Sequence, residues 1–192
     1  MHPEVRQATP GTCPKCGMAL VREGMKLIKP KRKLRDFTPL IVIFAVIFVL
    51  TGVALWRLGS WDAMTAMRYF EGFFFLIFGV FKLLNWKGFV DAYATYDILA
   101  KRSRLYGYAY PLIELGLGGA YLFSYHLLPT AWITLALMLI GSIGVAEELK
   151  KGNEIPCACL GVVFKIPMTW VTFTEDILMV IMATIMIGLL IR

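Results

Sequence analysis

Residues 26–56 read KLIKPKRKLRDFTPLIVIFAVIFVLTGVALW, a basic segment followed directly by an uncharged apolar run. The apolar run from Phe37 to Trp56 has the length that a helix needs to cross a hydrocarbon core of about 30 Å, at roughly 1.5 Å per residue. The six lysine and arginine residues before it favour the cytoplasmic side of a membrane. The stretch therefore predicts a membrane-spanning helix over residues 37–58 that starts on the inside.

The composition of the whole chain agrees with a membrane protein. Of 192 residues, 58% are hydrophobic, and the mean hydropathy of +0.68 lies well above that of a soluble globular chain. The net charge of +7 comes mainly from basic residues beside apolar runs, where they set orientation and contact anionic lipid. The lipid bilayer is the predicted partner, and binding to nucleic acid is not expected.

Further apolar runs predict more spans. They cover about residues 69–86, 108–126, 131–145 and 171–191. Residues 87–107 are amphipathic and predict a helix lying at the membrane interface. The fold class is therefore predicted to be an all-α membrane protein with five transmembrane helices, one at residues 37–58 and a four-helix bundle at residues 68–192.

Charge bias between the loops predicts the orientation. An inside start also places the segments near residues 87–106 and 147–170 on the inside, and both are rich in lysine and arginine. The opposite links carry only Arg57 and Arg68. The protein is predicted to be integral to the cytoplasmic (inner) membrane, with its N-terminus and two cysteine pairs facing the cytoplasm, where thiols stay reduced.

The first of these cysteine pairs lies in a turn-rich N-terminal segment that is too short to bury a core of its own. Cys13 and Cys16 are separated by two residues, a spacing at which two thiolates can close on one soft or borderline metal ion. His2 and the thioether of Met18 can complete the ligand set. Copper or zinc is the predicted ion, with a purely structural zinc site and a dithiol redox pair as alternatives.

The run MHPEVRQATPGTCPKCGMAL, residues 1–20, resembles the heavy-metal-binding domain of copper- and silver-transporting ATPases and of adaptor subunits of metal efflux systems. The resemblance implies a heavy-metal-binding head over residues 1–25. A basic juxtamembrane linker at residues 26–36 then joins this head to the first span.

Three later stretches resemble the MauE branch of the DoxX-like membrane proteins. They are FGVFKLLNWKGFVDAYATYDIL (78–99), YPLIELGLGGAYL (110–122) and PCACLG (156–161). The resemblance implies a four-helix membrane protein linked to thiol redox work and, for MauE, to maturation of methylamine dehydrogenase. Nothing in the residues identifies an amine dehydrogenase as the partner. The small-residue run GLGGA lets a neighbouring helix approach closely.

The second cysteine pair, Cys157 and Cys159, lies between Pro156 and Gly161. Thiols one residue apart form only a strained, easily reduced disulfide, and they can equally share a soft metal ion. Packing of two small side chains at a helix boundary is the structural alternative.

Charged groups inside the predicted spans are a third set of candidates, because each is costly unless it is paired or hydrated. Lys82 and Glu114 lie at similar depth and are predicted to pair, either to stabilise the bundle or to favour a thiolate in the loop above them. Glu71 and His126 lie toward the outer face, where a role in admitting protons or metal competes with ordinary interfacial placement.

The leading hypothesis is a membrane protein that binds and handles a soft heavy metal, captured by the first cysteine pair and received by the second. Its rival is a membrane thiol-disulfide carrier, which would be oxidoreductase-like, and a third hypothesis is a structural membrane subunit. A metal-transport or thiol-redox protein is the expected partner. The sequence has no nucleotide-binding motif, so ATP-driven pumping by this chain alone is not predicted.

Overall fold

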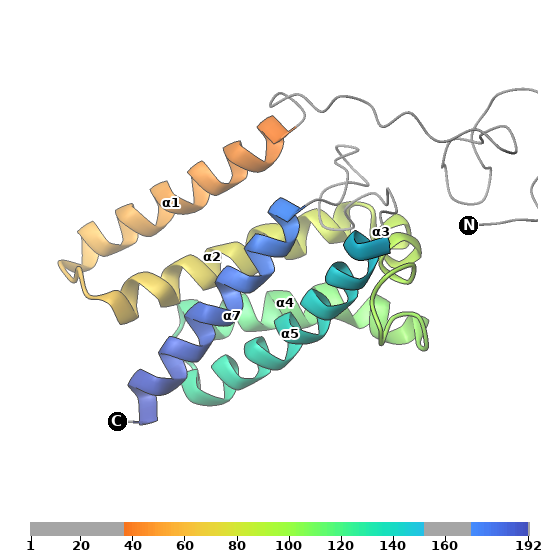
Figure 1. The fold of residues 1–192 in the computed structure, drawn as a ribbon. Coiled ribbons are helices and arrows are strands. Elements are labelled where there is room, and N and C mark those ends of the chain that lie inside the picture. The colour runs from red at the N-terminus through yellow and green to blue at the C-terminus, as the bar shows by residue number, and fades with distance from the viewer. Residues whose placement is uncertain (1–36, 152–169, 192) are drawn as a thin grey trace, which may run out of the picture. The chain divides into compact units, whose positions relative to one another are not determined.

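The computed structural model describes residues 37–151 and 170–191, which all belong to one compact unit, Phe37–Arg192. In these residues the chain forms six helices and no strand (Figure 1). The helices are α1 (Thr38–Leu58), α2 (Ala63–Leu84), α3 (Trp86–Tyr93), α4 (Arg104–Leu122), α5 (Leu127–Lys151) and α7 (Trp170–Ile191). The all-α class is confirmed for this part of the chain. The predicted head and its linker lie outside it.

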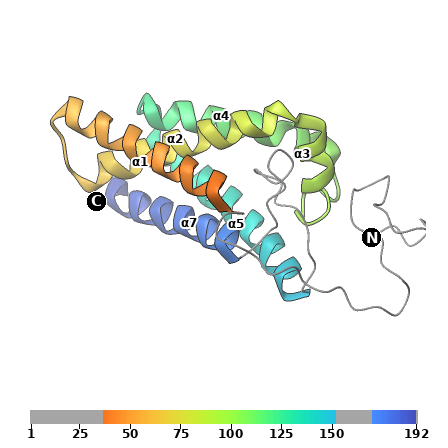
Figure 2. The ribbon, with the colours of Figure 1, turned by 90° about the horizontal axis from the view of Figure 1, so that it is seen from above.

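The long helices pack mainly as two pairs. α2 lies along α4 and α5 lies along α7, whereas contacts between one pair and the other are few. Figures 1 and 2 show these pairs side by side, with α1 against α2. Successive long helices run in opposite directions, so α2 ends, α4 begins, α5 ends and α7 begins at the same end of the bundle. We call this the α3 end.

Three helices are long and apolar enough to cross a membrane on their own. They are Thr38–Leu58, Leu127–Lys150 and Phe173–Ile191. α2 qualifies only together with α3, to which it is bent by 102°, and α4 does not qualify. Both α2 and α4 contain buried charged side chains, which lower their mean hydropathy. The described residues thus hold three candidate spans, or four with the bent pair, and the prediction of five is not confirmed.

α2 begins at Ala63, inside the segment predicted to be a link between the first two spans. The Asp62 carboxylate accepts a hydrogen bond from the Thr65 amide at 2.9 Å. This cap satisfies a backbone donor that the first turn of a helix leaves free, so the helix starts early. α1 ends at Leu58, before Gly59, whose φ of 66° is left-handed and suits glycine.

The predicted interfacial helix over residues 87–107 is wrong in its extent. Only α3 is regular helix before turns lead to α4. Asn85 caps the start of α3 and Ser103 caps the start of α4, each through a side-chain hydrogen bond to the backbone. Between them the Asp97 carboxylate accepts from the Leu99 amide at 2.9 Å, a local pattern that competes with a continuous helix.

Glycines bring α2 and α4 into close contact. A methyl group added at Gly72 would lie 2.6 Å from Leu122 Cδ2, and one added at Gly118 would lie 3.0 Å from the Gly72 carbonyl oxygen. The predicted close approach at the GLGGA run is therefore confirmed at Gly118. Gly116 and Gly119 face open space, so only one glycine of the run serves the contact.

Candidate functional site

Lys82 of α2 and Glu114 of α4 form an ion pair across the interface of their helices. The Lys82 ammonium donates to Glu114 Oε1, and the two side chains are 3% and 1% exposed. The Lys82 ammonium is therefore directed into the protein interior, toward Glu114. Each group supplies the partner that a buried charge requires.

Aromatic rings surround the Lys82 ammonium on its other side. Nζ lies 4.7 Å from the centroid of the Tyr110 ring and 5.6 Å from that of Phe89. The Tyr93 ring stacks on Phe89 at 5.0 Å and lies 4.7 Å from Tyr110. An ammonium over aromatic faces is stabilised most where water is excluded. The site therefore fixes the position of Lys82 by charge and by ring contacts together.

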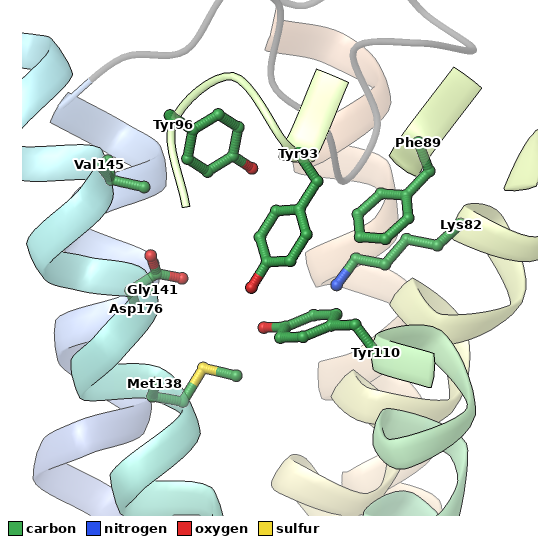
Figure 3. Close-up of a pocket in the computed structure, with 9 residues that line it drawn as sticks. All are labelled: Lys82, Phe89, Tyr93, Tyr96, Tyr110, Met138, Gly141, Val145 and Asp176. Carbon is green, nitrogen blue, oxygen red and sulfur yellow. The ribbon is translucent and has the colours of Figure 1, made fainter. Parts of the chain in front are cut away.

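A pocket of about 370 Å³, mouth included, opens beside the ion pair and between the two helix pairs. It is lined by Lys82, Phe89, Tyr93, Tyr96, Tyr110, Met138, Gly141, Val145 and Asp176. Figure 3 shows the Lys82 ammonium and the Tyr93 and Tyr110 hydroxyls directed into the space, with Asp176 of α7 on the opposite wall. The pocket thus presents hydrogen-bond donors and a carboxylate within largely apolar walls.

The Tyr93 hydroxyl is a hydrogen-bond donor at this pocket that is left unsatisfied. Tyr93 is 3% exposed, and its hydroxyl has no hydrogen-bond partner among the described residues. Buried hydroxyls are usually hydrogen-bonded, because an unsatisfied one loses its water without compensation. Water or a small polar molecule in the pocket would supply the acceptor.

The turn after α3 is held against α5 beside the pocket. A methyl group at Gly144 would lie 2.7 Å from the Tyr96 carbonyl oxygen, so only glycine fits this contact. Lys101 Nζ also lies 3.6 Å from Glu148 Oε1. These contacts connect the α2–α4 pair to the α5–α7 pair at the α3 end.

Glu71 lies in the other half of α2 and is fully buried. Neither carboxylate oxygen has a hydrogen-bond partner among the described residues. The Tyr121 hydroxyl lies close enough to the Glu71 carboxyl for a hydrogen bond, but it donates to Thr134 Oγ1 at 3.0 Å. His126 is exposed in the turn between α4 and α5, with a φ of 44°. Glu71 is therefore a core residue and His126 a surface residue. The role in admitting protons or metal that was predicted for both stays a prediction.

The predicted thiol and metal ligands are not among the residues that the structure describes. They are His2, Cys13, Cys16, Met18, Cys157 and Cys159. In residues 37–151 and 170–191, no group of three or more His, Cys, Asp or Glu side chains could hold a metal ion. The roles of the six residues stay predictions.

Sequence reasoning missed most of the pocket. The tyrosines at positions 93, 96 and 110 fall in segments that it treated as interfacial or as ordinary span, and Asp176 lies beyond the first turn of α7. A recognisable signal was present, because tyrosine recurs at intervals of three and four residues on both sides of the turn. Such spacing places Tyr106 and Tyr110 on one face of α4, whereas Tyr96 lies in the turn that follows α3.

Two family models match this chain. The heavy metal binding domain matches residues 1–23, and the methylamine utilisation protein MauE matches residues 59–190, more than half of the chain. The chain belongs to the MauE family. No curated protein and no solved structure matches it. The assignment of a heavy-metal-binding domain joined to a MauE-like membrane domain is thereby confirmed.

The MauE domain contains every element of the site described above. The ion pair, the pocket and Glu71 all lie between residues 59 and 190, whereas α1 ends just before the match begins. α1 therefore stands between the two matched domains in the sequence, and none of the residues that line the pocket comes from α1.

Proposed function

We propose that this membrane protein captures a soft heavy-metal ion at its N-terminal domain and passes it to a second thiol pair at the membrane surface. The observation that carries the proposal is the match of residues 1–23 to the heavy metal binding domain, on a chain whose residues 59–190 match MauE. Cys13 and Cys16 capture the ion, and Cys157 and Cys159 receive it.

The donor set of the N-terminal domain fits such an ion. Thiolates and thioethers prefer soft or borderline ions, and imidazole binds copper and zinc well. Cys13, Cys16, His2 and Met18 supply these groups, whereas the described membrane helices offer no comparable cluster. Copper or zinc is therefore the proposed ion, and the N-terminal domain is the proposed point of capture.

The second thiol pair follows the end of α5 closely in the sequence. Only residues 152–156 separate the end of α5 from Cys157. Because an extended chain spans at most about 3.6 Å per residue, the Cα atom of Cys157 lies within about 22 Å of that of Lys151. This distance supports a receiving site on the same side of the membrane as the pocket.

We also propose that α4 and the bent pair of α2 and α3 complete a bundle of five spans. α4 has 19 residues, which rise about 28 Å, close to the thickness of a hydrocarbon core. Its charged Glu114 faces inward, while Leu112 is 51% exposed on the outer face. Polar residues on the inward face of such a helix lower its mean hydropathy, but its apolar outer face still allows it to cross the membrane.

Side chains at the two ends of the bundle support the same placement, with the α3 end inside. Trp61, Phe123 and Tyr125 are exposed near one end, and Trp86 and Tyr108 near the other, as in the aromatic belts of membrane proteins. Lysine and arginine are concentrated at the α3 end. This orientation puts the α3 end in the cytoplasm of the cell.

Metal analysis tests the proposal. The full chain is purified in mild detergent under reducing conditions, and bound copper and zinc are measured with free thiols for the wild type and for serine variants. Cys13→Ser/Cys16→Ser should lose the stoichiometric metal, while Cys157→Ser/Cys159→Ser should keep it. Unchanged metal content in the first variant would refute capture by this pair.

A thiol-disulfide carrier is the second candidate. It is favoured by the pocket near the end of α5 and the start of α7, the two helices between which the second thiol pair lies in the sequence. In this alternative Cys157 and Cys159 cycle between thiols and a disulfide, and the metal site has only a structural role. Lys82 is already neutralised by Glu114, which limits its power to stabilise a thiolate. Thiol trapping distinguishes the candidates, because the carrier requires a disulfide between Cys157 and Cys159 that forms on mild oxidation and returns to thiols on reduction, whereas receipt of a metal ion requires the two thiols.

A further inference from the structure

Another buried carboxyl group, that of Glu71, lies apart from the ion pair. Glu71 is eight residues into α2, about 12 Å along the helix from its start, and its relative exposure is 0%. Neither Oε1 nor Oε2 accepts a hydrogen bond from any described residue. Buried carboxylates are almost always paired or hydrogen-bonded.

No charged group of the described helices compensates Glu71. On its own helix, Arg68 lies over the Tyr69 ring at 4.7 Å, and Lys82 is held by Glu114. The other charges of the packed helices stand near helix ends or far along them. They are Arg57 in α1, Arg104 and Glu114 in α4, Glu147, Glu148, Lys150 and Lys151 in α5, and Glu175 and Asp176 in α7. His126, in the turn between α4 and α5, is exposed.

The packing beside Glu71 leaves little space for water. The neighbouring Gly72 has Leu122 so close that an added methyl group would lie 2.6 Å from Leu122 Cδ2. One turn further, the Phe75 ring stacks on Tyr121 with 6.2 Å between centroids and 2° between planes. An ionised carboxylate in this environment would have neither a counter-charge nor hydration, both of which it needs.

We propose that Glu71 is a proton-binding site of the MauE domain, held as the neutral carboxylic acid in the core of the bundle. The comparison with Glu114 carries this inference, because the same chain buries two carboxyl groups between the same two helices. Glu114 has the Lys82 ammonium as its counter-charge, whereas Glu71 has none among the described residues. The proton takes the place of that ammonium.

The polar groups next to Glu71 suit exchange of this proton. The Tyr121 hydroxyl is in electrostatic range of the carboxyl and is already linked to Thr134 Oγ1 at 3.0 Å. Rotation of these two hydroxyls turns the tyrosine into a donor toward Glu71. The trio therefore connects a proton-binding carboxyl in α2 with hydroxyl groups in α4 and α5.

Labelling with dicyclohexylcarbodiimide tests the proposal, because this apolar reagent adds to protonated carboxyl groups in apolar surroundings and forms a stable acylurea. The full chain in lipid vesicles is treated over a range of pH and mapped by mass spectrometry. We expect an adduct at Glu71 that decreases as pH rises, and its loss in Glu71→Gln. Glu114 is the internal control and should stay unmodified.

Infrared spectroscopy covers the case in which the reagent does not reach the core. The carbonyl band of a protonated carboxylic acid should be present in the wild type and absent in Glu71→Gln, with Glu114→Gln retaining it. If the wild type lacks this band, the carboxyl is ionised and the proposal is overturned. Protection of Glu71 from labelling by an excess of sodium over choline chloride would also overturn it, because the site would then bind a monovalent cation.

Discussion

Removing the Lys82 ammonium should destabilise the MauE domain strongly. Lys82→Met keeps the length of the side chain but leaves the Glu114 carboxyl, which is 1% exposed, without its counter-charge. At alkaline pH this carboxyl must either stay ionised and unpaired or take up a proton at a cost in free energy. Removing one partner of a buried ion pair costs about 3–5 kcal/mol. At about 1.4 kcal/mol per factor of ten, the equilibrium between folded and unfolded protein should shift by roughly two to three and a half powers of ten.

The double variant Lys82→Met/Glu114→Gln supplies the matched control. It leaves no unpaired charge, and only an amide remains that lacks part of its hydrogen bonding, which costs about 1–3 kcal/mol. The double variant should therefore be more stable than Lys82→Met alone. Such a coupling between the two substitutions is what a double-mutant cycle measures.

Reversible unfolding in mixed micelles, followed on titration with a denaturing detergent, provides the free energies. Circular dichroism of the folded variants should first show unchanged helix content. A loss below about 1 kcal/mol for Lys82→Met, a value typical of an exposed pair, would refute the burial argument. A double variant that is less stable than the single variant would refute the pairing.

Two further predictions use other contacts of the same domain. Gly118→Ala should destabilise the bundle by about 1–3 kcal/mol, because the new methyl group would lie 2.9 Å from Leu76 Cγ. Gly116 has open space around it, so Gly116→Ala should be neutral or stabilising in the same unfolding assay. The hydrogen bond from the Thr65 amide lowers the pKa of Asp62. The cap of α2 is therefore strongest above the ordinary pKa of aspartate and is lost as pH falls through the lowered value. Asp62→Asn should remove this acid dependence of the thermal unfolding temperature, and a wild-type unfolding temperature that does not change in acid would contradict the cap.

Some elements followed directly from the sequence, because one physical effect dominates them. The uncharged run from Phe37 to Trp56 predicted α1 nearly to its ends, since only a helix satisfies the backbone of such a segment in lipid. The common depth of Lys82 and Glu114 predicted their pairing, because two opposite charges inside a bundle stabilise each other.

The bend and the pocket were not predictable in the same way. The chain turns by 102° near Asn85 without a proline or glycine at the break, and the asparagine side chain that caps α3 is a weak signal in a sequence. The pocket combines Tyr93, Tyr110 and Asp176, which come from three helices. Their meeting depends on how the two helix pairs pack, and the order of residues along the chain does not determine that.

The sparse contact between the two helix pairs has a mechanical consequence. At one end the pairs are fastened by the hydrogen bond between Tyr121 and Thr134, and at the other by Gly144 seated on the Tyr96 carbonyl. Between these fasteners the pairs part around the pocket. Because the pocket lies beside the Gly144 contact, at the α3 end, loss of this contact should let the pocket widen while each helix pair stays intact.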